Sequence, residues 1–185
     1  QGLGKSLFVS GFSRYMLCQN PLKQFACGIC RNCQQAGEDF SHPDVLQLAP
    51  LEGKRDINVE QIRSLTDFIV HTSHAGIAKI VIIDAAHHLN ISSANALLKT
   101  LEEPTQNSYL FLVTEFPGSL PATIRSRCQR ALFSSPAREV AQQWLSSKSL
   151  PESVVDIDRL LEAAECRPLY AIQLAEQGAV EQRDQ

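Results

Sequence analysis

Short apolar runs alternate with amphipathic stretches along most of this 185-residue chain. The runs have the length and composition of buried strands, and they cover residues 45–49, 79–85, 109–114 and 130–134. Between them, residues 57–71 and 92–103 carry apolar side chains at spacings of three and four, which predicts amphipathic helices. This alternation is typical of a parallel α/β sheet flanked by helices.

Local signals predict where some elements begin and end. Ser92 or Ser93 is the expected N-cap of the helix over 92–103, and Pro104 ends that helix because proline cannot continue it. After Pro136 the strand pattern stops, and three helical stretches follow at residues 138–148, 154–165 and 168–177. We therefore expect an α/β core over residues 1–134 and a small helical lid domain over 135–185.

Four cysteines lie close together near the start of the chain: Cys18, Cys27, Cys30 and Cys33. No signal peptide or long apolar span is evident, which favours a cytoplasmic chain whose thiols stay reduced. The spacing supplies the four thiolates of a closed tetrahedral zinc site, which is structural because no position is left for water. An iron–sulfur cluster and unrelated free thiols remain as alternatives. The segment 18–33 is thus predicted to be an inserted zinc module.

The chain opens with a fragment of a phosphate-binding motif. Gly4, Lys5 and Ser6 match the end of G-x-x-x-x-G-K-[ST], whose first glycine and preceding strand would fall before residue 1, so the chain is expected to start inside the loop. In such a loop the backbone amides and the lysine bind phosphates, and the serine hydroxyl binds Mg²⁺. An apolar strand that ends in Asp84 offers the other part of a nucleotide site, an aspartate at the end of a buried strand.

The residues after Asp84 bear on whether such a site hydrolyses ATP. A glutamate that polarises water would stand next to the aspartate in an active site of this kind, but the sequence here continues with Ala85 and Ala86. His87 or His88 is a candidate substitute base, and a solvated turn residue is the other interpretation. Binding of ATP or ADP without turnover is compatible with this pattern.

Three motifs together resemble the clamp-loader branch of the AAA+ family: LLKTLEEP at 97–104, FLVTE at 111–115 and IRSRC at 124–128. The cysteine cluster, placed between the first helix and the second strand, strengthens the resemblance. It implies an AAA+ parallel sheet of the P-loop type, followed by the helical lid. It also implies that the chain is a fragment that lacks a C-terminal collar domain.

The resemblance implies roles for individual residues. Arg127 matches an arginine finger presented in trans to ATP on a neighbouring subunit; the alternative is an arginine at a helix C-terminus, where a cation is favoured. Thr114 matches a polar sensor beside the γ-phosphate. Together with Gly4, Lys5, Ser6 and Asp84, it would form a degenerate nucleotide site.

Departures from the active members fall on the side of the chain's own ATP site. Ala85 replaces the glutamate, and Arg167, which precedes a proline, does not match the lid arginine that contacts ATP. The resemblance then implies a non-catalytic, stator-like subunit for loading a sliding clamp onto primed DNA. Its implied partners are an ATPase subunit next to Arg127, a delta-type subunit and the clamp. An active ATPase subunit is the alternative.

A third hypothesis treats the cysteine cluster as a nucleic-acid-binding ribbon. Lys23 and Arg31 are the cations in this segment, which is few for contacts with phosphates. The net charge of -3 also fails to indicate a globally cationic surface. We expect a bacterial cytoplasmic protein that does not bind membranes.

Overall fold

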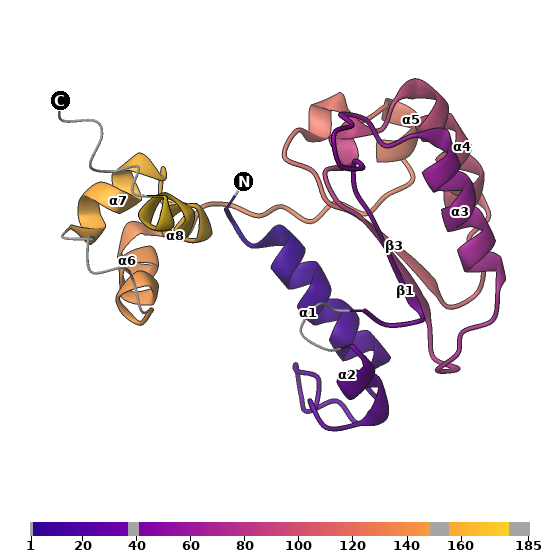
Figure 1. The fold of residues 1–185 in the computed structure, drawn as a ribbon, viewed down its shortest axis with the longest axis horizontal. Coiled ribbons are helices and arrows are strands. Elements are labelled where there is room, and N and C mark those ends of the chain that lie inside the picture. The colour runs from indigo at the N-terminus through magenta and orange to yellow at the C-terminus, as the bar shows by residue number, and fades with distance from the viewer. Residues whose placement is uncertain (1, 37–40, 149–155, 178–185) are drawn as a thin grey trace. The chain divides into compact units, whose positions relative to one another are not determined.

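The computed structural model describes residues 2–36, 41–148 and 156–177 (Figure 1). The chain divides into two compact units. Residues Ser6–Arg130 form one of them, and the other combines Gln1–Lys5 with Ala131–Gln185. The division between core and lid near residue 134 stays a prediction. In the described ranges, no helix has both the length and the apolar character needed to cross a bilayer.

A three-stranded parallel sheet forms the centre of the larger unit. Its strands are β1 (Val45–Leu48), β2 (Lys79–Ile83) and β3 (Ser108–Leu112), in the order β1-β2-β3. Every residue of β2 is buried, as expected for the central strand of a sheet covered on both faces. The α/β fold class predicted from the alternating pattern is confirmed.

One predicted strand is wrong. Residues 130–134 form no strand, and Leu132 in their middle is 78% exposed. A strand requires a neighbour for its backbone hydrogen bonds, and no described segment pairs with this one. The apolar composition of the segment alone therefore gave an incorrect prediction.

Side chains of β2 alternate between two hydrophobic cores. Val81 and Ile83 pack with α3 (Val59–Val70) and α4 (Ile91–Glu102), which lie together on one face of the sheet (Figure 1). Ile80 and Ile82 belong to a second core that includes Val9 and Leu17 of α1 (Lys5–Leu17). Because successive side chains of a strand point to opposite faces, the unit has the helix–sheet–helix layers expected of a parallel α/β domain.

The start of α4 differs from the prediction. Its N-cap is Asn90, whose side-chain oxygen accepts a 2.9 Å hydrogen bond from the amide of Ser93, so neither Ser92 nor Ser93 is the cap. The hydroxyl of Ser93 instead donates to the carbonyl oxygen of Ile57 at 2.8 Å. The end of the helix at Glu102, two residues before Pro104, agrees with the predicted stop.

Short elements complete the larger unit. They are α2 (Arg31–Gln35) beside the cysteines, two single-turn helices at Ala86–His88 and Pro117–Ser119, and α5 (Ala122–Arg125). Contacts between α4 and α5 bring the segment after α5 to the end of α4. This placement determines the surroundings of Arg127.

Three helices form the smaller unit: α6 (Arg138–Ser146), α7 (Ile157–Ala163) and α8 (Pro168–Glu176). Leu145, Leu160 and Leu161 are buried at its centre. Residues 154–155 of the predicted second helix lie outside the described residues. The N-terminal segment packs here too, because the amide of Leu169 donates to the carbonyl oxygen of Gly2 at 3.1 Å.

Candidate functional site

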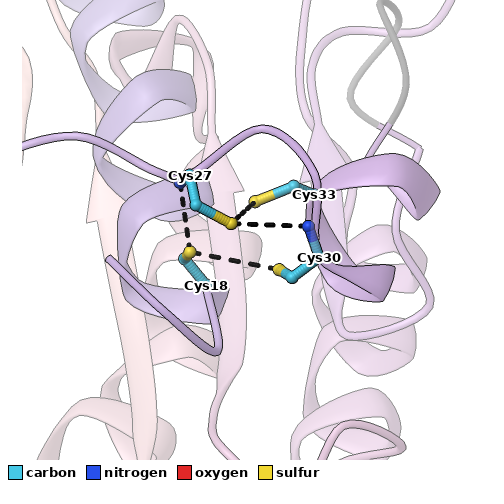
Figure 2. A group of neighbouring side chains, drawn as sticks. All are labelled: Cys18, Cys27, Cys30 and Cys33. Carbon is cyan, nitrogen blue, oxygen red and sulfur yellow. Dashed lines mark hydrogen bonds between the residues drawn. The ribbon is translucent and has the colours of Figure 1, made fainter. Parts of the chain in front are cut away.

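The four predicted metal ligands come together at one point (Figure 2). The sulfur atoms of Cys18, Cys27, Cys30 and Cys33 all lie within 4.8 Å of one another. The Sγ atoms of Cys18 and Cys30 are 4.0 Å apart, and so are those of Cys27 and Cys33. A tetrahedral ion with Zn–S bonds of about 2.3 Å places its sulfurs about 3.8 Å apart, so the two separations of 4.0 Å are close to those around a single zinc ion.

Backbone amides donate hydrogen bonds to two of these sulfurs. The amide of Cys27 donates to Cys18 Sγ at 3.3 Å, and the amide of Cys30 donates to Cys27 Sγ at 3.4 Å. Hydrogen bonds from the amides of Ile29 and Cys30 lower the pKa of Cys27, because they stabilise its thiolate. Turns that point amides at sulfur are built by the local sequence, including Gly28 with its φ of +76°.

The pKa values of the Cys30 and Cys33 thiols are shifted in opposite directions. Hydrogen bonds from the amides of Cys33 and Gln19 lower the pKa of Cys30 to about 6. Burial, followed by its contact with Cys30, raises the pKa of Cys33 to about 12. Four adjacent thiols cannot all ionise without a compensating charge, and a divalent cation supplies that charge.

The folded chain brings Ser6 and Asp84 together. The Ser6 hydroxyl, in the first turn of α1, donates to Asp84 Oδ1 at 2.9 Å, although the residues are 78 positions apart. Asp84 directly follows β2, because the strand ends at Ile83 and not at residue 85 as predicted. A hydroxyl and a carboxylate in contact are the protein groups that hold Mg²⁺ next to a bound phosphate.

Gly4 and Lys5 belong to the smaller unit, whereas Asp84 belongs to the larger one, so each is described within its own unit. Gly4 has a φ of +79°, a conformation that glycine adopts without strain, and Lys5 begins α1. A helix start preceded by a glycine is the local arrangement that a phosphate-binding loop requires.

Thr114 lies at the same edge of the sheet as Asp84. The register pairs Ile83 with Leu112, so the residues that follow β2 and β3 emerge side by side. Thr114 Oγ1 lies 3.4 Å from Nδ1 of His87, which therefore belongs to this edge as well. Ligands of parallel sheets bind at the carboxyl ends of the strands, where these groups gather.

Ala85, which directly follows Asp84, has a left-handed conformation with a φ of 51°. This turn directs the chain from β2 into the helix at Ala86–His88. The methyl group of Ala85 has no proton-accepting atom, so position 85 cannot activate water.

Arg127 lies after α5 and is held by groups from two helices. Its Nη2 forms a 2.7 Å ion pair with Glu102 Oε1, and its Nη1 donates to the carbonyl oxygen of Thr123 at 2.9 Å. The side chain is 37% exposed, so the guanidinium remains accessible from outside. Sequence analysis did not identify Glu102 as a partner, although it lies in the LLKTLEEP motif.

A buried polar network lies at the opposite edge of the sheet. Asp44, which is fully buried, accepts hydrogen bonds from the amides of His74 and Ala75 at 2.7 Å each and pairs with Lys79 at 3.3 Å. It ties the loop before β2 to the start of β1. No sequence motif indicated this network, because its partners are separated by about thirty residues.

Comparisons with known proteins agree with the resemblance drawn from the motifs. The family model described as "DNA polymerase III, delta subunit" matches residues 1–137. A "DNA polymerase III subunit delta'" from Pseudomonas aeruginosa is 37% identical over 185 residues, which is 100% of this chain and 56% of that protein. Its counterpart from Escherichia coli is 42% identical over 147 residues, 78% of this chain and 43% of that protein.

A solved structure supports the same relationship. The crystal structure of a DNA polymerase III, gamma subunit-related protein from Thermotoga maritima matches with a TM-score of 0.58 at 27% identity. The match covers 80% of this chain and 49% of that one. The chain spans about half the length of the curated relatives it matches. Because the family model covers well over half of the sequence, the chain belongs to the DNA polymerase III delta subunit family.

Proposed function

We propose that the chain is part of a non-catalytic, stator-like subunit of the clamp loader in the DNA polymerase III holoenzyme. In this role Arg127 acts as an arginine finger on ATP bound to a neighbouring subunit while the sliding clamp is loaded onto primed DNA. The observation that carries the proposal is an asymmetry. The accessible guanidinium of Arg127 is present, whereas Ala85 stands where the site's own base would be.

The position of Arg127 supports action on another subunit. Asn90, the N-cap of α4, follows Asp84 by six residues, whereas Glu102 ends the same helix. With a rise of about 1.5 Å per residue, the ends of this helix are about 17 Å apart. Glu102 therefore holds the guanidinium at the end of α4 remote from Asn90, which is consistent with an acceptor outside this chain.

The candidate nucleotide site supports the alternative, an active ATPase subunit. Ser6 and Asp84 are in contact, and a hydroxyl beside a carboxylate supports binding of Mg²⁺ with ATP or ADP. What this site lacks is a base at position 85. Nucleotide binding without turnover reconciles the two observations, and steady hydrolysis by the full-length subunit alone would favour the alternative.

The cysteine cluster is proposed to hold a structural Zn²⁺. Four thiolates fill a tetrahedral shell and exclude water, so an ion here stabilises the fold and does not activate a substrate. Zinc is preferred to an iron–sulfur cluster because the spacing of the sulfurs fits a single ion. The nucleic-acid ribbon is less favoured, because Lys23 and Arg31 are its few cations.

The proposed partners follow from the family. They are an ATPase subunit that receives Arg127, a delta-type subunit, the sliding clamp and, as part of the complex, primed DNA. The relatives come from bacteria, and a cytoplasmic location is part of this proposal.

The test is the DNA-stimulated ATP turnover of a reconstituted complex that carries Arg127→Ala in the full-length subunit. We expect turnover to fall about tenfold or more, because arginine fingers contribute about 10³ to 10⁵ in phosphoryl transfer. Arg125→Ala is the matched control, since Arg125 is exposed on the same segment and should leave turnover unchanged. Normal turnover by an intact Arg127→Ala complex would refute the proposed role of Arg127.

A further inference from the structure

The ion pair between Arg127 and Glu102 fixes one side of the guanidinium. Glu102 Oε1 accepts from Nη2 at 2.7 Å, while the Thr123 carbonyl oxygen and the Ser126 hydroxyl lie 2.9 and 3.4 Å from Nη1. These acceptors come from α4 and from α5 with its C-cap Ser126, and the two helices are in contact with each other. The orientation of the side chain therefore depends on both elements.

The described contacts leave part of the guanidinium for an outside acceptor. A guanidinium has five N–H donors, and the contacts with Glu102, Thr123 and Ser126 use three of them. The N–H of Nε and the second N–H of Nη2 remain. Two donors in one plane suit the oxygens of a phosphate, so the pairing restrains Arg127 without consuming its capacity to bind one.

The pair contributes little to the stability of the fold. The side chains are 37% and 49% exposed, and ion pairs at such exposure are weak because water screens them. In addition, Glu102 is the last residue of α4, where the negative end of the helix dipole disfavours a carboxylate. Neither helix stability nor packing explains a glutamate at this position.

We infer that Glu102 is the positioning residue of Arg127, which holds the guanidinium in the orientation that meets a phosphate on the neighbouring subunit. This inference rests on the proposed function of Arg127. Glu102 itself touches no nucleotide in this scheme. It acts by restricting the arginine, whose long side chain otherwise samples many rotamers.

The test uses the reconstituted complex with Glu102→Ala in the full-length subunit. Alanine preserves the helix, so α4 should remain folded and the thermal unfolding of the subunit should be nearly unchanged. We expect kcat for DNA-stimulated ATP turnover to fall about fivefold or more, with KM for ATP changed less than about twofold, because the interaction matters in the transition state. Glu103→Ala is the matched control and should behave as the unmodified subunit.

A double variant separates this inference from the proposed function. If Glu102 acts through Arg127, Glu102→Ala should cause less than about a twofold further loss when Arg127 is already alanine. Unchanged or increased turnover by Glu102→Ala would overturn the inference, and so would an equal loss in the Arg127→Ala background. If instead Arg127→Ala alone has no effect, the proposed function fails first. Glu102→Leu, which also lacks an acceptor for Arg127 and favours a helix, gives the same decision if the alanine variant does not fold.

Discussion

His42 is a buried titratable residue with an unusual hydrogen-bonding state. Its Nδ1 accepts a 3.0 Å hydrogen bond from the amide of Asp44, which requires an unprotonated Nδ1. Its Nε2 is buried and has no partner among the described residues. Burial is the main reason that the pKa of His42 is lowered from its ordinary value of 6.5, with smaller contributions from His74 and Lys79 and an opposing one from Asp44.

This state predicts a loss of stability on acidification. A depressed pKa means that the folded chain favours neutral His42, so the contribution is fully present above pH 6.5 and is lost as pH falls through the folded pKa. The free energy of unfolding should decline below pH 6.5 with a slope of at most about 1.4 kcal/mol per pH unit from this residue. His42→Asn, which can still accept from Asp44, should flatten the slope in urea titrations. His71→Asn, at an exposed histidine, is the control, and an unchanged slope in His42→Asn would contradict the prediction.

A second acid transition belongs to Asp44. Burial opposes ionisation of this carboxyl, but hydrogen bonds from Ala75, His74 and Ser73, with the contact to Lys79, outweigh it and lower its pKa from 3.8. The stability that Asp44 provides is therefore complete above pH 3.8 and is lost only below that value. The decline between pH 6.5 and 4 thus reports on His42 and not on Asp44.

At the scale of single elements, helix α1 contains a glycine that neither its backbone conformation nor close packing requires. Gly11 is exposed in the middle of Lys5–Leu17, and a Cβ added there meets no atom within 4 Å. Gly11→Ala should raise the free energy of unfolding by about 0.5 to 1 kcal/mol, because alanine loses less backbone entropy in a helix. Chemical denaturation followed by circular dichroism measures this change.

Gly28→Ala provides the matched comparison for Gly11→Ala. A Cβ at Gly28 also meets open space, but this residue has a φ of +76°. The substitution should therefore destabilise the chain by about 1 kcal/mol through backbone strain. Destabilisation by Gly11→Ala would show that this part of α1 is covered in the folded protein, contrary to the prediction.

Sequence patterns predicted the positions of helices and strands better than they predicted the contacts between them. The apolar runs at 45–49, 79–85 and 109–114 correspond to the three strands, because a buried parallel strand must be apolar on both faces. The run at 130–134 has the same composition but no pairing partner, and pairing cannot be seen in a local pattern. The cap of α4 was misplaced for a similar reason, since the hydroxyl of Ser93 bonds to distant Ile57.

The same distinction between local patterns and distant contacts applies to the residues of the candidate site. Cys18, Cys27, Cys30 and Cys33 were identified from spacing, because a metal site built within sixteen residues is a local feature. The pairs Arg127–Glu102 and Ser6–Asp84 join residues that are 25 and 78 positions apart, so only the fold brings them into contact. Motifs suggested both Ser6 and Asp84, but they did not indicate that Glu102 is the partner of Arg127.

At the scale of the whole molecule, the cysteine module and the sheet share limited packing. Asn32 donates to the carbonyl oxygen of Leu17 at 2.8 Å, and Ala36 packs in the core with Leu17 and Ile80. The larger core, between the sheet and helices α3 and α4, contains no residue of the segment 18–36. The metal should therefore stabilise the module locally, while the sheet is stabilised by its own hydrophobic core.

Removal of the metal tests this division. The purified chain should contain about one zinc per molecule. A strong chelator should remove it by competing for the ion, after which the thiolates reprotonate. Hydrogen exchange should increase over residues 18–36, whereas the amides of β2 stay protected by the core around Val81 and Ile83. Cys30→Ser should reproduce the effect without chelator, and Cys128→Ser, outside the cluster, should not. Loss of protection in β2 together with the module would mean that the metal supports the whole α/β unit.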